Sequence, residues 1–260
     1  MITTVWRVIS LRLRRGLLAE TKPDPMKWRR MLSSFLSGDG IEIGPLHRPL
    51  PLEEALVSRI RYVDRLSIED LRRHYPELSG HPFTRVDIID DGETLQHFSE
   101  TSLDFIGANH FIEHTRNPIG TIRTWAGKLR PGGIIWMSVP HKAYTFDVDR
   151  PITSMEHLKQ DDLPSPAARD GRDAEHYLEY ARLVDQKSGD AGHEHARKLA
   201  EAGYSIHFHT FVGSSFLEMV KYLQDELLVP INLLAYVDTS VETGEFLVLL
   251  RKRKLAAGGA

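Results

Sequence analysis

The sequence predicts an α/β fold in which a largely parallel sheet carries helices on both faces. Strand and helix patterns alternate through the middle of the 260-residue chain, as they do when helices connect parallel strands. The continuous apolar run at residues 134–139 is typical of a central strand that is buried on both faces. Residues 141–203 contain no strand pattern and are rich in charge and histidine, which predicts a mostly helical insertion after the fifth strand.

The elements follow from short local patterns. Ser67, with Asp70 three residues later, resembles a helix N-cap, and Pro118 suits the first turn of a helix that ends before residues 130–133. The last two strands are joined by a short link, which predicts an antiparallel edge. The predicted strands are residues 40–44, 60–64, 86–89, 103–108, 134–139, 231–237 and 245–251, and the predicted helices between them are 52–58, 67–74, 118–129 and 214–228.

Four regions result from these patterns. They are an N-terminal basic helical segment (1–37), a ligand-binding core (38–140), an inserted segment that could cover the site (141–203), and a C-terminal part that completes the sheet (204–253).

Composition excludes some classes of protein. The net charge of −3 gives no reason to expect a nucleic-acid partner, and the chain has no cysteine for a disulfide or a thiolate nucleophile. We expect a cytoplasmic protein, since the lack of cysteine fits that compartment. The composition indicates no particular oligomeric state.

Residues 1–30 have a local charge of +6, from eight basic and two acidic residues. Apolar residues recur between the basic ones at helical spacing, so a basic amphipathic helix is expected. This helix could pack on the domain, or it could make peripheral contact with a membrane surface. No apolar run approaches the roughly 20 residues that a transmembrane helix needs.

Acidic residues follow three successive predicted strands. Glu42 and Gly44 end the first strand, Asp64 ends the second, residues 90–93 follow the third, and Asn109 with His110 follows the fourth. Ligands of open α/β sheets bind at these carboxyl ends. The sequence therefore predicts a binding site at this edge of the sheet.

Several segments, in the correct order, resemble the motifs of the class I S-adenosylmethionine (SAM)-dependent methyltransferases. The most telling is residues 129–133, Leu-Arg-Pro-Gly-Gly, before an apolar strand. The others are residues 41–44 (Ile-Glu-Ile-Gly), 91–95 (Asp-Gly-Glu-Thr-Leu), 102–106 (Ser-Leu-Asp-Phe-Ile) and 110–114 (His-Phe-Ile-Glu-His). The resemblance implies a Rossmann-like fold with a seven-stranded sheet, and SAM as cofactor.

The resemblance also implies roles for the residues at the strand ends. Gly44 would let the backbone approach the methionine end of SAM, and Glu42 would face its ammonium group. Asp64 would accept hydrogen bonds from the ribose hydroxyls, and Asp91, helped by the backbone around Gly92, from the adenine amino group.

Catalysis by such an enzyme requires alignment of the acceptor, the methyl group and the sulfur. Asn109 and His110 would line the cleft near the methyl group. A hydroxyl acceptor also benefits from a general base, for which His141, just past the fifth strand, and His110 are the candidates. Asp147 lies six residues after His141 and would join it in the acceptor pocket.

The first motif departs from the family pattern, because residues 45–49 are Pro-Leu-His-Arg-Pro where two further glycines are usual. Those glycines let a pyrophosphate pass close to the backbone in dinucleotide folds, so their loss disfavours a nicotinamide enzyme. Leu46 and His47 could narrow the methionine pocket.

Two histidine pairs, His193 with His195 and His207 with His209, offer an alternative metal site. They lack cysteine partners and the helical spacing of familiar zinc sites, so we predict no metal and hydrogen-bonded histidines instead.

We therefore predict an enzyme that transfers a methyl group from SAM to a small polar acceptor, most plausibly at a hydroxyl oxygen of a sugar or another polar metabolite. The polar insertion favours a hydroxylated acceptor. The alternatives are a non-catalytic SAM-fold binding or partner protein and, disfavoured by the missing glycines, a nicotinamide-dependent oxidoreductase.

Overall fold

The computed structural model, which describes residues 24–162 and 170–254, contains a seven-stranded sheet of order β3-β2-β1-β4-β5-β7-β6. Neighbouring strands from β3 to β5 are parallel, whereas β7 runs antiparallel to both β5 and β6. The predicted fold class and the antiparallel edge are therefore confirmed. The strands are β1 (Gly38–Ile43), β2 (Val57–Asp64), β3 (Ile88–Ile89), β4 (Leu103–Asn109), β5 (Leu129–Pro140), β6 (Ile231–Asp238) and β7 (Glu245–Lys252).

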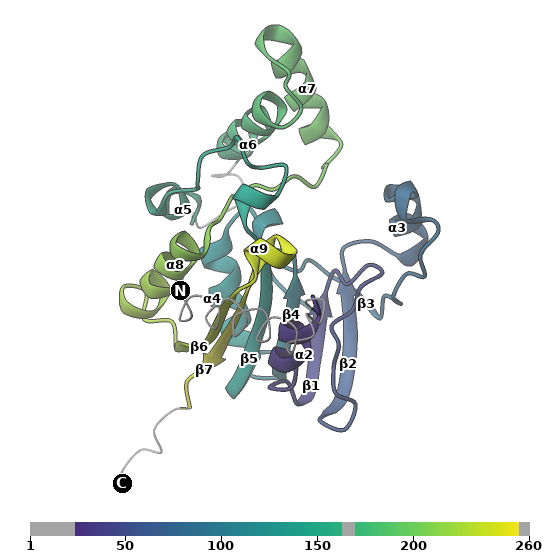
Figure 1. Cartoon of the computed structure of the whole chain (residues 1–260), viewed down its shortest axis with the longest axis vertical. Helices are drawn as coiled ribbons and strands as arrows, with labels where there is room; N and C mark the ends of the chain where they lie inside the picture. The colour runs from purple at the N-terminus through teal and green to yellow at the C-terminus, as the bar shows by residue number, and fades with distance from the viewer. Residues whose placement is uncertain (1–23, 163–169, 255–260) are drawn as a thin grey trace, which may run out of the picture.

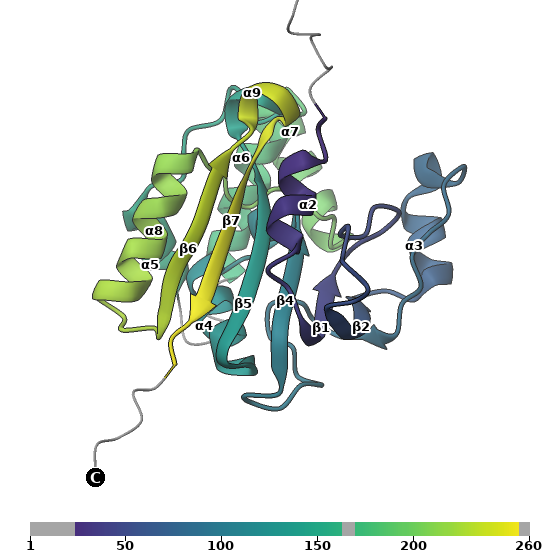
Figure 2. The same cartoon turned by 60° about the horizontal axis from the view of Figure 1, so that its bottom comes forward.

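Helices cover both faces of this sheet (Figures 1 and 2). Helix α2 packs on one face, and α4 and α8 pack on the other. The α-helices are α2 (Lys27–Ser33), α3 (Ile68–His74), α4 (Pro118–Lys128), α5 (Met155–Asp161), α6 (Asp170–Leu183), α7 (Gly189–Glu201), α8 (Gly213–Asp225) and α9 (Ser240–Thr243). Short 3₁₀ turns are η1 (Pro76–Leu78), η2 (Ile112–His114) and η3 (Lys142–Tyr144).

The alternation of side chains along β5 produces the two halves of the core. Ile135 and Met137 join the cluster beneath α4 and α8, whereas Ile134 and Trp136 join the cluster beneath α2. Successive side chains of a strand point to opposite faces of the sheet. A continuous apolar run therefore requires helices to pack on both faces.

Local signals placed some helices correctly and one wrongly. The Ser67 Oγ accepts a hydrogen bond from the Asp70 N–H at 3.2 Å, so the predicted N-cap of α3 is confirmed. The predicted helix over residues 52–58 is wrong. Residues 54–56 form a turn, and Val57 begins β2 because it pairs with Gly38 of β1. Pairing along the sheet overrides local helix propensity here.

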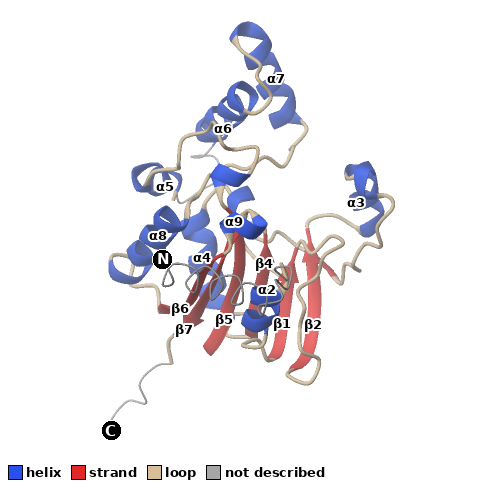
Figure 3. Ribbon diagram, viewed as in Figure 1, coloured by secondary structure: helices blue, strands red, loops and turns tan. Residues whose placement is uncertain are grey.

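The predicted helical insertion is confirmed: η3, α5, α6 and α7 follow β5 and lie beyond the carboxyl ends of the parallel strands (Figures 1 and 3). Residues 1–23, which carry most of the predicted amphipathic helix, are outside the described residues. Among the helices that the structure describes, none is long and apolar enough to cross a membrane.

Candidate active site

A cavity of about 480 Å³ lies at the carboxyl ends of β1 to β4, where the fold predicts a ligand. Its volume is in the range of small-molecule sites. The wall consists of residues that follow the four strands, together with a residue just before α4 and one in the return segment, the chain between α7 and α8. These are Ile43, Gly44, Leu46, Asp64, Arg65, Tyr75, Ile89, Asp90, Asp91, Gly92, Glu93, His110, Phe111, His114, Arg116 and Ser205.

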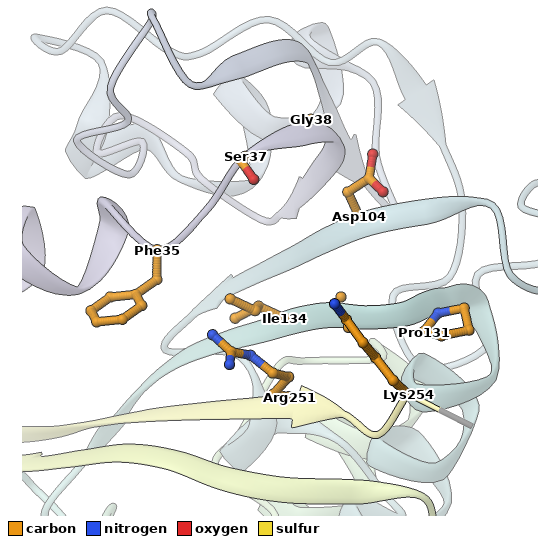
Figure 4. A pocket seen from close by; sticks show the side chains of 10 residues that line it. Phe35, Ser37, Gly38, Asp104, Pro131, Ile134, Arg251 and Lys254 are labelled. Atoms are coloured by element: carbon orange, nitrogen blue, oxygen red, sulfur yellow. The ribbon is translucent and has the colours of Figure 1, made fainter. Parts of the chain in front are cut away.

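A second hollow, of about 560 Å³, lies at the opposite edge of the sheet (Figure 4). Asp104 at the start of β4, and Arg251 and Lys254 at the end of the chain's last strand, surround it. This hollow is at the amino ends of β4 and β5, so the cavity at the carboxyl ends is the candidate active site.

Carboxylates of the cavity wall suit the hydroxyl and amino groups of a nucleoside. Asp64 ends β2 with 9% of its surface exposed, and its Oδ1 accepts the Leu66 N–H at 3.2 Å. Asp91 is exposed after β3, and the carbonyl of Gly92 is held by the Trp125 indole N–H at 2.8 Å. Ile89 leaves 55% of its surface exposed beside them and offers an apolar face to a planar base.

The loop after β1 contains two residues in the left-handed region of backbone conformation. Gly44 has φ +60°, and Leu46, two residues later, has φ +47°. An L residue rarely adopts this left-handed conformation, and outliers of this kind concentrate at functional sites. Leu46 adopts this conformation at a turn after β1, and its side chain lines the cavity.

Glu42 does not line the cavity, contrary to the role expected for it. It is fully buried, and both carboxylate oxygens lie 3.0 Å from the Leu50 backbone N–H, which donates to them. Burial raises the pKa of Glu42 to about 8, although the Leu50 N–H and Arg29 oppose this shift. Strand alternation explains the position, since Glu42 points to the face opposite to Ile41 and Ile43. Its observed contact anchors the end of the loop.

Asn109 also lies outside the cavity wall. Its Oδ1 accepts from Arg29 of α2 at 2.9 Å and from the Ser138 hydroxyl. Arg29 in turn forms a two-point ion pair with Glu245, with Nε–Oε1 and Nη2–Oε2 distances of 2.9 and 2.5 Å. Asn109 is therefore part of a polar network that joins α2 to β4, β5 and β7.

His110 connects this network to the cavity. Its backbone has φ +49°, and its ring, 44% exposed, lines the wall. Nε2 lies 2.6 Å from Oε2 of Glu245. Burial lowers the pKa of His110, but the hydrogen bond to Glu245 and the charge of Glu113 outweigh it, so the net pKa is raised. A histidine held by an ionised carboxylate is suited to proton transfer.

His141 and Asp147 are not brought together. His141 Nδ1 accepts a hydrogen bond from the Ala143 N–H at 3.3 Å, and neither side chain is part of the cavity wall. Asp147 is buried and pairs with Arg150 at 2.8 Å and with His207 Nδ1 at 2.6 Å. It therefore holds the insertion to its own return segment.

A family model described as a methyltransferase domain matches residues 33–208. The chain belongs to this methyltransferase family. Its methyl donor is SAM, as the motifs imply. No curated protein sequence matches the chain.

Solved structures are similar in fold only. A Rhodobacter sphaeroides protein named as a Zn-dependent alcohol dehydrogenase has a TM-score of 0.51 at 13% identity, over 88% of this chain and 91% of its own. A SAM-dependent methyltransferase from Mesorhizobium loti has a TM-score of 0.48 at 14% identity, over 88% and 98%. One from Methanosarcina mazei has a TM-score of 0.45 at 15% identity, over 86% and 98%.

The residues of this methyltransferase fit SAM. The left-handed turn at Gly44 and Leu46 brings backbone to the wall without a phosphate-binding glycine cluster, and SAM carries no phosphate. Asp64 and Asp91 are hydrogen-bond acceptors at the ends of adjacent strands, as a ribose diol and an exocyclic amine require.

Sequence reasoning missed several residues of the methyltransferase's site. Glu245 and Arg29 carry no local motif. His114 belongs to the recognised 110–114 segment, but no role was assigned to it. Its Nδ1 faces the carbonyl of Ile206 at 2.8 Å, and burial lowers its pKa to about 3, so it is neutral. Next to it, Glu113 is buried, and its carboxylate makes no hydrogen bond to the described residues.

Proposed function

We propose that this methyltransferase transfers the methyl group of SAM to a hydroxyl oxygen of a small polar acceptor, with His110 as the general base. The observation that carries the proposal is the 2.6 Å contact between His110 Nε2 and Glu245 Oε2 beside the cavity. Because Glu245 is ionised and occupies Nε2–H, Nδ1 is the ring nitrogen that can accept a proton.

Bound SAM supplies an electrophilic methyl group on a sulfonium, whose leaving group is a neutral thioether. In methyl transfer to a hydroxyl, His110 Nδ1 would take the proton of the acceptor hydroxyl. Glu245 stabilises the imidazolium that results, and Arg29 holds Glu245 in place from α2. The buried ion pair between Arg29 and Glu245 fixes the orientation of the His110 ring before the acceptor binds.

Polar groups on the same wall support a hydroxylated acceptor. His114 and Ser205 face the cavity, and Arg116, which pairs with Asp173 of α6 at 2.6 Å, completes this side. These groups offer hydrogen bonds to several hydroxyls, as in a sugar. An apolar acceptor would displace water from the remaining donors and acceptors of these groups without forming hydrogen bonds to them.

The cofactor roles remain those that the motif resemblance implies for the cavity residues. Asp64 binds the ribose hydroxyls, Asp91 and the backbone at Gly92 bind adenine, and Gly44 with Leu46 adjoins the methionine end. Glu42 acts through the loop that it anchors rather than through contact.

The test uses methyl-labelled SAM and a panel of sugars and other polar metabolites, with transfer measured by mass spectrometry. The position of the label in the product identifies the acceptor atom. His110→Ala should lower turnover by about 10²–10⁴-fold with nearly unchanged SAM affinity. The matched control is His195→Ala, which removes a histidine that pairs with Asp185 at 2.7 Å and is not part of the cavity wall. SAM binding without transfer to any acceptor would favour a non-catalytic binding protein.

A further inference from the structure

Four side chains that are far apart in sequence converge inside the insertion. His157 and Asp161 lie one turn apart on α5, His176 is on α6, and His209 is on the segment that returns to the sheet. One ligand atom of each lies within 4.8 Å of the others. None of the four is part of the cavity wall.

Four of the six distances between the ligand atoms are close to those around a single tetrahedral ion. Oδ2 of Asp161 lies 3.0, 3.3 and 3.9 Å from Nε2 of His157, His176 and His209. The two Nε2 atoms of His157 and His176 are 3.3 Å apart. Bonds of about 2.0–2.2 Å to a tetrahedral zinc ion place its ligand atoms roughly 3.3 Å from one another.

Burial makes this arrangement costly without an ion. Asp161, His176 and His209 expose 2%, 5% and 0% of their surface. Neither ring nitrogen of His209 makes a hydrogen bond to the described residues. A buried polar atom without a partner costs about 1–3 kcal/mol, and unexplained cases of this kind suggest an ion.

The surroundings of the cluster orient its ligands. Arg172 bonds to Oδ1 of Asp161 and so leaves Oδ2 directed toward the three histidines. Metal-bound carboxylates and imidazoles commonly have such outer partners.

We propose that His157, Asp161, His176 and His209 bind one structural Zn²⁺ ion. Three imidazoles and one carboxylate are the donor set of zinc rather than of magnesium or calcium, which prefer oxygen. The ion joins α5, α6 and the return segment. The backbone N–H of His209 donates to the Glu113 carbonyl at 3.2 Å, so the ion also fixes the insertion to the turn after β4.

This assignment differs from the histidine pairs that the sequence suggested. His193 and His195 lie on α7, where a spacing of two places them on different sides of the helix: His193 is exposed, and His195 pairs with Asp185. His207 bonds to Asp147, so of the second pair His209 alone belongs to the cluster.

The experiment measures metal in the full chain, purified without a histidine tag or chelator from zinc-supplemented cells. Elemental analysis should find about one zinc per chain in the wild type and in His195→Ala. The double variant His157→Ala, Asp161→Asn should lose at least tenfold of this zinc. Cobalt added to metal-free wild type should produce the visible absorption of tetrahedral Co²⁺, and the double variant should not.

Thermal unfolding provides a second readout that does not depend on methyl transfer. Chelation should lower the Tm of the wild type and leave that of the double variant unchanged, with circular dichroism confirming that both are folded. A wild type that contains no zinc, gives no cobalt spectrum and keeps its Tm with chelator would overturn the proposal. So would full zinc content in the folded double variant, or another metal such as copper in place of zinc.

Discussion

His110 Nε2 lies 2.6 Å from Glu245 Oε2, although 135 positions separate the two residues in the chain. The antiparallel register of β5 and β7 creates this contact, because Glu245 pairs with Pro140 at the end of β5. The backbone of His110 is in the left-handed region, which directs its ring toward the same point. The proposed base at the end of β4 and the residue that orients it at the start of β7 thus come from distant parts of the chain.

The pH dependence of turnover tests this pair. Glu245 raises the pKa of His110, and a base must be neutral to act, so kcat/KM should rise with pH through a midpoint above 6.5. Glu245→Gln removes the charge and should move the midpoint to lower pH. SAM affinity, measured in parallel, should change little because Glu245 is not part of the cavity wall. An unchanged midpoint would remove His110 as the titrating base.

Removal of the Asp64 carboxylate should weaken SAM binding. Asp64→Ala leaves the ribose hydroxyls without their acceptor, at a cost of about 1–3 kcal/mol, or roughly 5- to 150-fold in Kd. Titration calorimetry with SAM measures the change. Asp225→Ala, which removes a carboxylate from an exposed ion pair on α8, is the control. Equal affinities of the two variants would contradict the assigned role.

The left-handed conformation of Leu46 predicts an unusual order of stabilities. Leu46→Ala and Leu46→Gly both remove the side chain, but only glycine adopts φ +47° without strain. The glycine variant should therefore be more stable than the alanine variant by about 1 kcal/mol. Urea unfolding measures the difference. A more stable alanine variant would indicate that the loop does not keep this conformation.

Stability should fall as pH rises because of Glu42. Its pKa is raised in the folded protein from 4.5 to about 8, so between these values the folded state keeps a proton that the unfolded state has lost. Below pH 4.5 Glu42 is protonated in both states, so its full contribution to the free energy of unfolding is present. Above about pH 8 this contribution is completely lost. At about 1.4 kcal/mol per pKa unit, the free energy of unfolding should fall by several kcal/mol across this pH range.

Glu42→Gln isolates this contribution. Gln can still accept a hydrogen bond from the Leu50 N–H, but it does not titrate. The free energy of unfolding of the variant should therefore fall less than that of the wild type as the pH rises from 5 to 8. Denaturant unfolding at several pH values provides the comparison. Identical slopes in the two proteins would show that Glu42 ionises in the folded state at its usual pKa.

Much of the fold was predictable because its signals are local. The apolar run of β5, the cap at Ser67 and the turn before Ile134 each depend on neighbours within a few residues. The acidic residues at the strand ends follow from where each strand stops. The prediction of a helix over residues 52–58 was wrong because the local pattern carries no information on the pairing of Val57 with Gly38.

The sequence by itself determined the order of strands and helices, the family and the set of strand-end residues from which the cavity is built. Tertiary structure alone decided which of them face the cavity and what partners they have. Glu42 and Asn109 turn to the α2 side because strand side chains alternate, and Glu245 reaches His110 only through β7. Such contacts depend on packing between distant segments, and the free energy of packing is not encoded in the spacing of residues along one segment.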